Sequence, residues 1–380
     1  MKPKTPSSEA ELADLISGAT EPLRILGGGT RPIGVPVNGA PVSTAGLSGV
    51  ELYEPGALTL VAKSGTPVGN IEKTLAAEGQ RLAFEPMDHR GLLGTKGVPT
   101  IGGVFAANVS GPRRIQTGAA RDFLLGVRFV DGQGQITRNG GRVMKNVTGY
   151  DIVKLMAGSY GTLGVITEVA LKVLPCSHMT ATLIYAGLSD TDAVKALSSA
   201  LGSPFEVSGA AHRPGDPDGA SQTLIRIEGF ENSVAYRAAE ITKKLASFGE
   251  PRLELNADAN TALWRDIRDV APFHKPKGDV WRLSLKPSDA PSLVAGLDAK
   301  DVLYDWGGGL VWLLMPENSQ GSAIRESVAK TGGHATLMRG NRASGAFQPL
   351  SAPVAALQDG LRARFDPKGL LNPGLMGRAA

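Results

Sequence analysis

Apolar and polar positions in the first half of the chain predict a mixture of helices and strands. Residues 8–16 have the spacing of a helix with one apolar face, and Ser7 or Ser8 is suited to cap its first turn. Residues 165–173 alternate with the period of two expected of a strand that buries one face. Further strands are predicted at residues 24–26, 58–63 and 126–130, and further helices at 67–77 and 152–157. This order favours an α+β fold over a regular series of parallel βαβ units.

The pattern changes after Pro175, where strands and helices alternate in two rounds. The first round has strands at residues 181–185, 205–207 and 224–228, with helices at 190–201 and 233–248. The second has strands at 280–285, 302–305, 310–315 and 335–338, with a helix at 321–330. These elements predict an antiparallel sheet faced by helices on one side. A closing helix at 351–365 is expected to return to the first half, which divides the chain into residues 1–175, 176–340 and 341–380.

The composition of the 380 residues is that of a globular protein with a sizeable core, since 42% are hydrophobic and 20% are charged. Lys and Arg exceed Asp and Glu by 40 − 36 = 4, and the basic residues are scattered along the chain. No face for nucleic acid is therefore predicted.

The cysteine content and the N-terminal sequence further restrict the class of protein and its cellular compartment. The single cysteine, Cys176, excludes an internal disulfide, a zinc site with several Cys ligands and an iron–sulfur cluster held by this chain alone. We expect Cys176 to be a buried core thiol. Residues 1–6 lack the apolar segment of a signal peptide, and no run of about 18 apolar residues follows, so we expect a cytosolic protein without a transmembrane segment.

Glycine is enriched, at 49 of 380 residues or about 13% against an average of about 7%. Gly27 to Gly29 follow a short apolar strand and form either a phosphate loop or an ordinary turn, with neither a Walker sequence nor a G-x-G-x-x-G motif. Gly102 and Gly103 lie in a short helix of small residues, which suits a flat ligand or close helix packing. Gly158 to Gly164 lie in a unit typical of a helix, a turn and a strand. Gly140 and Gly141 are expected in a turn or loop without a ligand.

Taken together, these segments resemble in order and spacing the FAD-binding domain of the vanillyl-alcohol oxidase family, also called the PCMH-type FAD domain. The resemblance covers roughly residues 20–175. In the rest of the chain, residues 263–268, 281–284, 305–308 and 365–374 are similar to the FAD-binding E subunits of glycolate oxidases. The resemblance implies an α+β, two-domain PCMH-type FAD-binding fold, in which an antiparallel-sheet cap domain covers the flavin ring.

The resemblance also implies which residues bind FAD. The loop around the pyrophosphate would be Gly27, Gly28, Gly29 and Thr30, and the flavin side of the groove would be lined by Thr100, Gly102, Gly103, Asn108, Ser110 and Gly111, with Gly161, Gly164 and Ile166 also in contact. Backbone N–H groups without bulky side chains suit an anionic pyrophosphate. Many family members bond the flavin covalently through a histidine just after the glycine loop, whereas this chain continues Thr30-Arg31-Pro32. We therefore expect non-covalent FAD.

A division of labour among subunits follows from the same resemblance. The resemblance implies that this chain is the FAD-binding subunit of a glycolate oxidase complex that converts glycolate to glyoxylate. In that complex a flavin-containing D subunit oxidises glycolate and an iron–sulfur F subunit accepts the electrons. The complex can sit at the cytoplasmic face of the membrane. Two alternatives stay open: a self-sufficient FAD-dependent dehydrogenase of a 2-hydroxy acid or alcohol, and a structural subunit without a redox role.

The catalytic residues of the second half are not assigned. Related D-2-hydroxy-acid dehydrogenases hold a metal in a histidine-rich motif, but the histidines of this chain stand alone, at His89, His178, His212, His274 and His334. No metal site is predicted, and a structural role is favoured for each histidine. A carboxylate could be held by Arg268, Arg282 or Arg339. An apolar wall could be lined by Trp264, Trp281 or Trp306. Ordinary structural roles are the preferred interpretation of these residues too.

Overall fold

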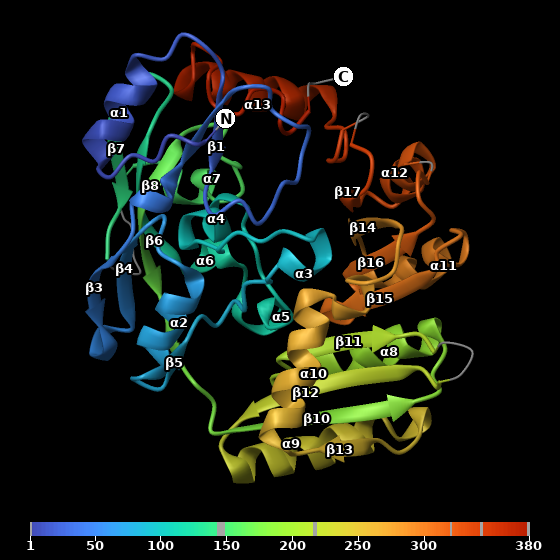
Figure 1. Cartoon of the computed structure of the whole chain (residues 1–380). Helices are drawn as coiled ribbons and strands as arrows, with labels where there is room; N and C mark the ends of the chain where they lie inside the picture. Colours follow the sequence, from blue (N-terminus) through green and yellow to red (C-terminus); the bar gives the residue numbers. More distant parts are fainter. Residues whose placement is uncertain (1, 143–148, 216–218, 320, 343–344, 378–380) are drawn as a thin grey trace.

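The computed structural model describes residues 2–142, 149–215, 219–319, 321–342 and 345–377. Two parts lie side by side, each built on its own antiparallel sheet (Figure 1). Within the described residues, no helix is both long and apolar enough to span a bilayer.

The first part is organised by a five-stranded sheet with the order β3-β4-β8-β6-β7. Its strands are β3 (Val50–Glu54), β4 (Thr59–Lys63), β6 (Leu124–Val130), β7 (Ile136–Gly140) and β8 (Val165–Lys172). The strand predicted at residues 165–173 is confirmed as β8, which pairs antiparallel with both β4 and β6. The expectation that it buries only one face is wrong, because all its residues except Glu168 and Lys172 are buried in this central strand. Two smaller sheets flank it, the parallel pair β1 (Leu23–Leu26) with β2 (Ala40–Ser43) and the antiparallel pair β5 (Gln80–Arg81) with β9 (Leu174–Pro175).

Short helices surround this sheet: α1 (Glu9–Ser17), α2 (Val68–Ala76), α3 (Arg90–Leu93), α4 (Ile101–Ala106), α5 (Arg114–Thr117), α6 (Ala120–Phe123) and α7 (Ile152–Met156). The predicted cap of α1 is confirmed, because the Ser8 side chain accepts from the N–H of Glu11. Helix α4 packs against β4 and β8, and a Cβ at Gly102 would lie 2.5 Å from Cβ of Ser64. Only glycine allows this approach.

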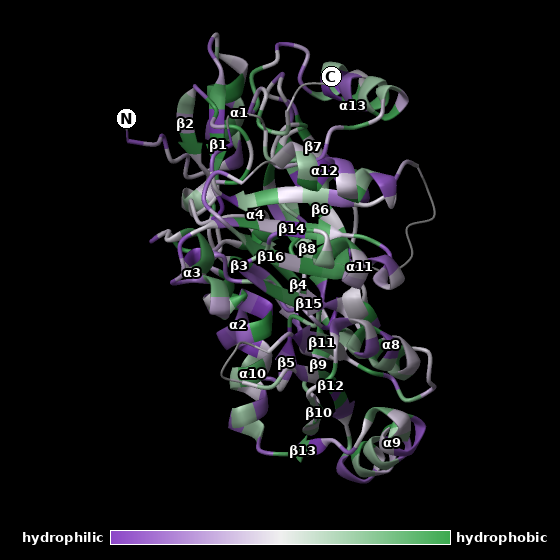
Figure 2. Cartoon of the chain, turned by 90° about the vertical axis from the view of Figure 1, so that its right-hand side faces the viewer, coloured by the Kyte–Doolittle hydropathy of each residue, from purple (hydrophilic) through white to green (hydrophobic). Residues whose placement is uncertain are grey.

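The second part is an eight-stranded antiparallel sheet with the order β13-β10-β12-β11-β15-β16-β14-β17. Its strands are β10 (Met179–Ala186), β11 (Gly209–Arg213), β12 (Gln222–Gly229), β13 (Arg252–Glu254), β14 (Asp279–Ser284), β15 (Asp301–Asp305), β16 (Leu310–Met315) and β17 (His334–Arg339). Helices α8 (Asp190–Leu201), α9 (Glu231–Lys244), α11 (Ala290–Ala295) and α12 (Gly321–Lys330) lie along one side of it (Figure 2). The predicted antiparallel sheet is therefore confirmed.

The prediction that helices cover only one face of this sheet is wrong. Leu183 on β10 packs with Leu197 of α8 and Val234 of α9, whereas Thr182 points to the opposite face. There its hydroxyl oxygen accepts a hydrogen bond from Nε1 of Trp264, 2.8 Å away on helix α10 (Ala257–Asp269). The sequence pattern did not predict α10, because most of its residues are polar and its buried face includes Asn260 and Asp269.

Three further expectations are corrected. The strand predicted at residues 205–207 lies later, as β11. Gly140 ends strand β7 opposite Gly126 instead of forming a turn. Cys176 is exposed, because it lies in the connection between the two sheets directly after β9.

The C-terminal helix α13 (Ala352–Phe365) leads the chain back to the first part, as predicted. Beyond it, the N–H of Leu23 donates to the carbonyl of Leu370, at 2.7 Å, and the N–H of Ile25 donates to Oδ1 of Asn372, at 2.8 Å. Strand β9 still pairs within the first part, and β10 already belongs to the second sheet. The chain thus passes from the first sheet to the second between β9 and β10, and the domain boundaries at residues 175 and 340 stay predictions.

A buried network of charges joins the two parts. Glu228 on β12 lies 2.7 Å from Nε of Arg113 and 2.7 Å from Nη1 of Arg81, both in the first part. Glu85 completes the network at 2.9 Å from Arg113 and 2.9 Å from Arg226, which also lies on β12. These ion pairs fix how the second part sits against the first.

Candidate cofactor and ligand site

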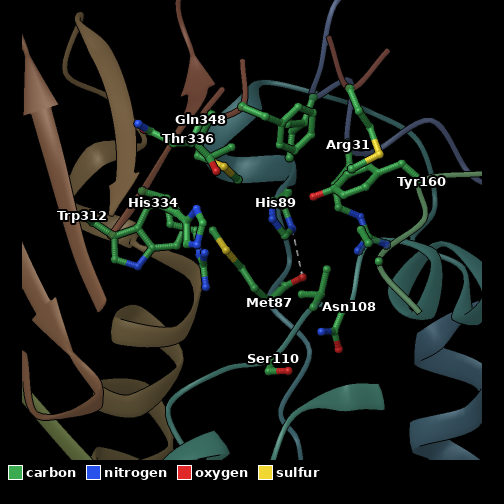
Figure 3. Close-up of a pocket in the computed structure, with 18 of the residues that line it drawn as sticks. Arg31, Met87, His89, Asn108, Ser110, Tyr160, Trp312, His334, Thr336 and Gln348 are labelled. Atoms are coloured by element: carbon green, nitrogen blue, oxygen red, sulfur yellow. Dashed lines mark hydrogen bonds between the residues drawn. The ribbon is translucent and has the colours of Figure 1, made fainter. Parts of the chain in front are cut away.

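A cavity of about 580 Å³ lies where the two parts meet. The first part contributes Arg31, Met87, His89 and Tyr160, among others, and the second contributes Arg282, Trp312, His334 and Thr336. Figure 3 shows His89 between Trp312 on one wall and Tyr160 and Arg31 on the other. This volume is within the range of pockets that hold small ligands and cofactors.

A smaller hollow of about 70 Å³ lies over the first part and shares Tyr160 with the large cavity. It is lined by six of the predicted FAD residues: Gly27, Gly102, Gly103, Gly161, Gly164 and Ile166. Two further predicted residues, Asn108 and Ser110, line the large cavity. The structure thus places eight predicted residues along two neighbouring hollows.

The other five predicted residues, Gly28, Gly29, Thr30, Thr100 and Gly111, line neither hollow. Gly29 has a φ of +70°, and a Cβ there would meet nothing within 4 Å, so it faces open space. Gly28 has neither property, since its Cβ would lie 1.5 Å from the carbonyl oxygen of Val98. Thr30 is buried, and Thr100 caps α4 through the N–H of Gly103.

Asn108, Ser110 and Gly111 have structural contacts as well. Oδ1 of Asn108 accepts from the N–H of Arg121, at 3.0 Å, and Oγ of Ser110 accepts from the N–H of Ala120, at 2.8 Å. The carbonyl of Gly111 accepts from Nε1 of Trp306, at 3.0 Å, across the boundary between the parts. The first two contacts fix residues that line the large cavity, and the third joins the two parts beside it.

The large cavity is cationic. Three arginines line it, Arg31, Arg114 and Arg282, and no Asp or Glu is among the described residues of its wall. Burial lowers the pKa of Arg31 and of Arg282 to about 10 each, so both stay charged at neutral pH. Nη1 of Arg31 is buried without a hydrogen-bond partner in the described part of the chain. A buried cation without a partner is costly, so the cavity is suited to an anionic ligand.

Arg282 is held by aromatic rings. Its guanidinium carbon lies 5.2 Å from the ring centre of Trp306 and 6.0 Å from that of Trp312. Arg114 lies over the same Trp306 ring, at 4.5 Å. These contacts position a cation and leave its N–H groups free for a ligand.

The other candidate arginines and tryptophans have structural roles. Arg339 donates to the carbonyls of Leu92 and Phe273, among others, and Arg268 pairs with Asp269, at 2.8 Å. Trp264 and Trp281 are buried in the core. Of the six residues singled out in the sequence, only Arg282 lines the cavity.

His89 and Tyr160 belong to the cavity although the sequence analysis did not assign them to it. His89 is 5% exposed, and its Nδ1 lies 3.3 Å from the carbonyl oxygen of Met87. Burial and then the charge of Arg31 lower the pKa of His89 to about 3, so its ring is neutral. Tyr160 has a φ of +52°, and burial raises its pKa, so its hydroxyl stays protonated. No local sequence pattern signals either position.

The residues present fit FAD. The small hollow offers glycine backbone for a pyrophosphate, and Arg31 offers an unpaired guanidinium at the edge of the large cavity, beside Gly103. The large cavity has the flat and apolar walls that a flavin ring requires, in Trp312, Met87 and Tyr160. Among the described residues, no group of three or more His, Cys, Asp or Glu side chains is arranged to hold a metal ion.

Known structures share this fold. p-Cresol methylhydroxylase superposes with a TM-score of 0.70 at 13% identity, covering 99% of this chain and 88% of that one. An alkyldihydroxyacetonephosphate synthase superposes with a TM-score of 0.69 at 18% identity, covering 97% and 76%. The expected two-part PCMH-type fold is confirmed.

Comparison of sequences identifies the family. Residues 4–140 match the family described as "FAD binding domain". The glycolate oxidase subunit GlcE of Escherichia coli K12 is 37% identical over 358 residues, which are 93% of this chain and 92% of that protein. The glycolate oxidase subunit GlcD of Bacillus subtilis is 40% identical over a shorter stretch of 87 residues. The chain therefore belongs to the FAD-binding oxidoreductase family of glycolate oxidase subunit GlcE.

Proposed function

We propose that this chain is the FAD-binding subunit of a complex that oxidises glycolate to glyoxylate and passes the electrons through flavin to an iron–sulfur partner. One observation carries the proposal: the glycine-lined hollow and the arginine-lined cavity share Tyr160, so the phosphate and the ring of one dinucleotide have adjoining places. The family relationship to GlcE agrees with it.

The residues of this chain would divide the cofactor between them. Gly27, Gly102, Gly103 and Arg31 would hold the pyrophosphate, and Asn108 and Tyr160 would flank the ring. When bound, flavin supplies the hydride acceptor for an alcohol. In many relatives a histidine just after the glycine loop bonds the flavin, whereas the residues that follow the loop in this chain are Thr30, Arg31 and Pro32, none of which forms that bond. FAD is therefore held without a covalent link.

The proposed partners are a flavin-containing D subunit and an iron–sulfur F subunit. The single cysteine of this chain cannot build a cluster, so the iron must come from a partner. Peripheral association with the cytoplasmic face of the membrane would then be a property of the assembled complex.

We expect the isolated, metal-free chain to bind FAD and yet to be reduced only slowly by glycolate. His89, with its pKa of about 3, is too weak a base to remove the hydroxyl proton efficiently near neutral pH. Anaerobic mixing with glycolate, followed through the flavin absorbance, measures the rate with and without the D and F subunits. Fast reduction should need the partners.

Two results would replace this proposal. Rapid bleaching of the flavin in the isolated chain would favour a self-sufficient dehydrogenase. Full activity of a complex whose GlcE-type chain holds no FAD would favour a structural subunit. Co-purification from the native source, with flavin and iron counted, establishes which partners are present.

A further inference from the structure

The large cavity contains an unused hydrogen-bond acceptor beside its cations. His89 is neutral, and its Nδ1 lies within hydrogen-bond reach of the carbonyl of Met87, which assigns the ring proton to that nitrogen (Figure 3). Nε2 then carries a lone pair, and among the described residues it has no hydrogen-bond partner. A ligand that fills this part of the cavity must offer a donor or leave the nitrogen unpaired.

The cations of the cavity select the charge of that ligand. Arg282 makes no hydrogen bond or ion pair with any described residue, and cation–π contacts with the rings of Trp306 and Trp312 hold it in place. Its charge also acts on the ring of His89, so the two groups lie within electrostatic reach of each other. A guanidinium binds a carboxylate through two parallel hydrogen bonds, and a carboxylate is small enough to share the cavity with a flavin ring.

We propose that the cavity of this chain binds a small hydroxy acid, with the carboxylate on Arg282 and the hydroxyl donating to Nε2 of His89. The inference rests on the proposed function, which places the flavin ring against the same cavity. It gives the chain a hydroxy-acid site of its own, in addition to any site of its partners. His89 acts there by selecting a hydroxyl-bearing ligand.

Glycolate and acetate test this arrangement directly, because they differ only in the hydroxyl group. Calorimetric titration of the FAD-loaded chain under anaerobic conditions should show glycolate binding about 3- to 10-fold more tightly than acetate, the factor expected of one hydrogen bond. Equal affinities, or no binding of either ligand, would overturn the proposal. This comparison needs no variant and so does not depend on the folding of one.

Two variants separate the role of His89 from that of Arg282. His89→Phe should remove the preference for glycolate and retain acetate binding. Arg282→Met should weaken both ligands at least about tenfold, the effect of losing a charge-assisted pair. Arg252→Met is the matched control, because Arg252 is exposed on β13, and it should bind as the parent does. A retained preference in His89→Phe, or unchanged binding in Arg282→Met, would contradict the assignment.

FAD content, measured before each titration, distinguishes a failure of the proposed function from a failure of the hydroxy-acid site. A chain that lacks FAD contradicts the proposed function. A chain that holds FAD and binds no glycolate contradicts only the hydroxy-acid site.

Discussion

Replacing Glu228 by Gln is expected to lower the free energy of unfolding by about 3–5 kcal/mol, the cost of breaking a buried ion pair from one side. The side chain of Glu228 is 4% exposed and has Arg81, Arg113 and Arg226 within 4 Å. Without its charge, Arg113 and Arg226 keep Glu85 as their ion-pair partner, and Arg81 loses its ion pair. Urea denaturation of the two proteins measures the difference.

The same variant has a predicted pH dependence. Burial alone would raise the pKa of Glu228, but the charges of Arg226, Arg113 and Arg81 hold it well below 4.5. The stabilisation is therefore present above about pH 4.5 and is lost as the pH falls through the lower pKa of the folded state. The free energies of unfolding of parent and variant should therefore converge in acid.

The control is Glu240→Gln, which removes an exposed pair with Lys243 and should cost about 1 kcal/mol or less. An equally small loss of stability in Glu228→Gln would show that the buried ion pairs of Glu228 do not stabilise the fold.

Replacing Gly28 by Val is expected to reduce the FAD content of the folded chain at least about tenfold, or 1.4 kcal/mol in binding free energy. A Cβ at Gly28 would lie 1.5 Å from the carbonyl oxygen of Val98, and a Cβ at Gly97 would lie 1.8 Å from that of Gly28. The two loops therefore touch backbone to backbone. A side chain at residue 28 must push them apart and displace Thr100 and Gly103 at the start of α4.

Flavin absorbance per folded chain, with folding checked by circular dichroism, measures this effect. Gly56→Val is the matched control, because Gly56 is exposed and a Cβ there meets nothing within 4 Å. The control should keep its FAD. Full FAD content in a folded Gly28→Val chain would show that FAD binding does not need the close contact between the two loops.

The glycine-rich half of the candidate site was predicted through the family resemblance, because its glycines lie in short local patterns; taken singly, each pattern fitted either a ligand or close packing. Gly102 shows the limit of that reasoning, since it lines a hollow and also permits the contact of α4 with Ser64. Gly28 stays a predicted contact of FAD, and the structure gives it a packing role as well. Its backbone does not have a positive φ, and its Cβ would meet Val98 rather than a ligand.

The cationic half of the site could not be predicted, because it forms only when distant segments meet. Arg31, His89 and Tyr160 lie far apart along the chain, and Arg282 reaches them from the other sheet. A lone arginine or histidine in the sequence is most often structural, as Arg339 and His212 are here. Most strands of the second part were predicted, but β11 was placed too early and β13 was missed. Helix α10 was missed as well, because its buried face includes the polar Asn260 and Asp269.

The central claim is that this chain holds FAD without a covalent bond in the groove between its two parts. Acid precipitation of the purified, FAD-loaded chain tests it most directly. The account predicts that stoichiometric FAD is released into the supernatant and that the precipitated protein is free of flavin. Flavin that stays on the precipitated chain, or a folded chain that binds no FAD at all, would contradict it.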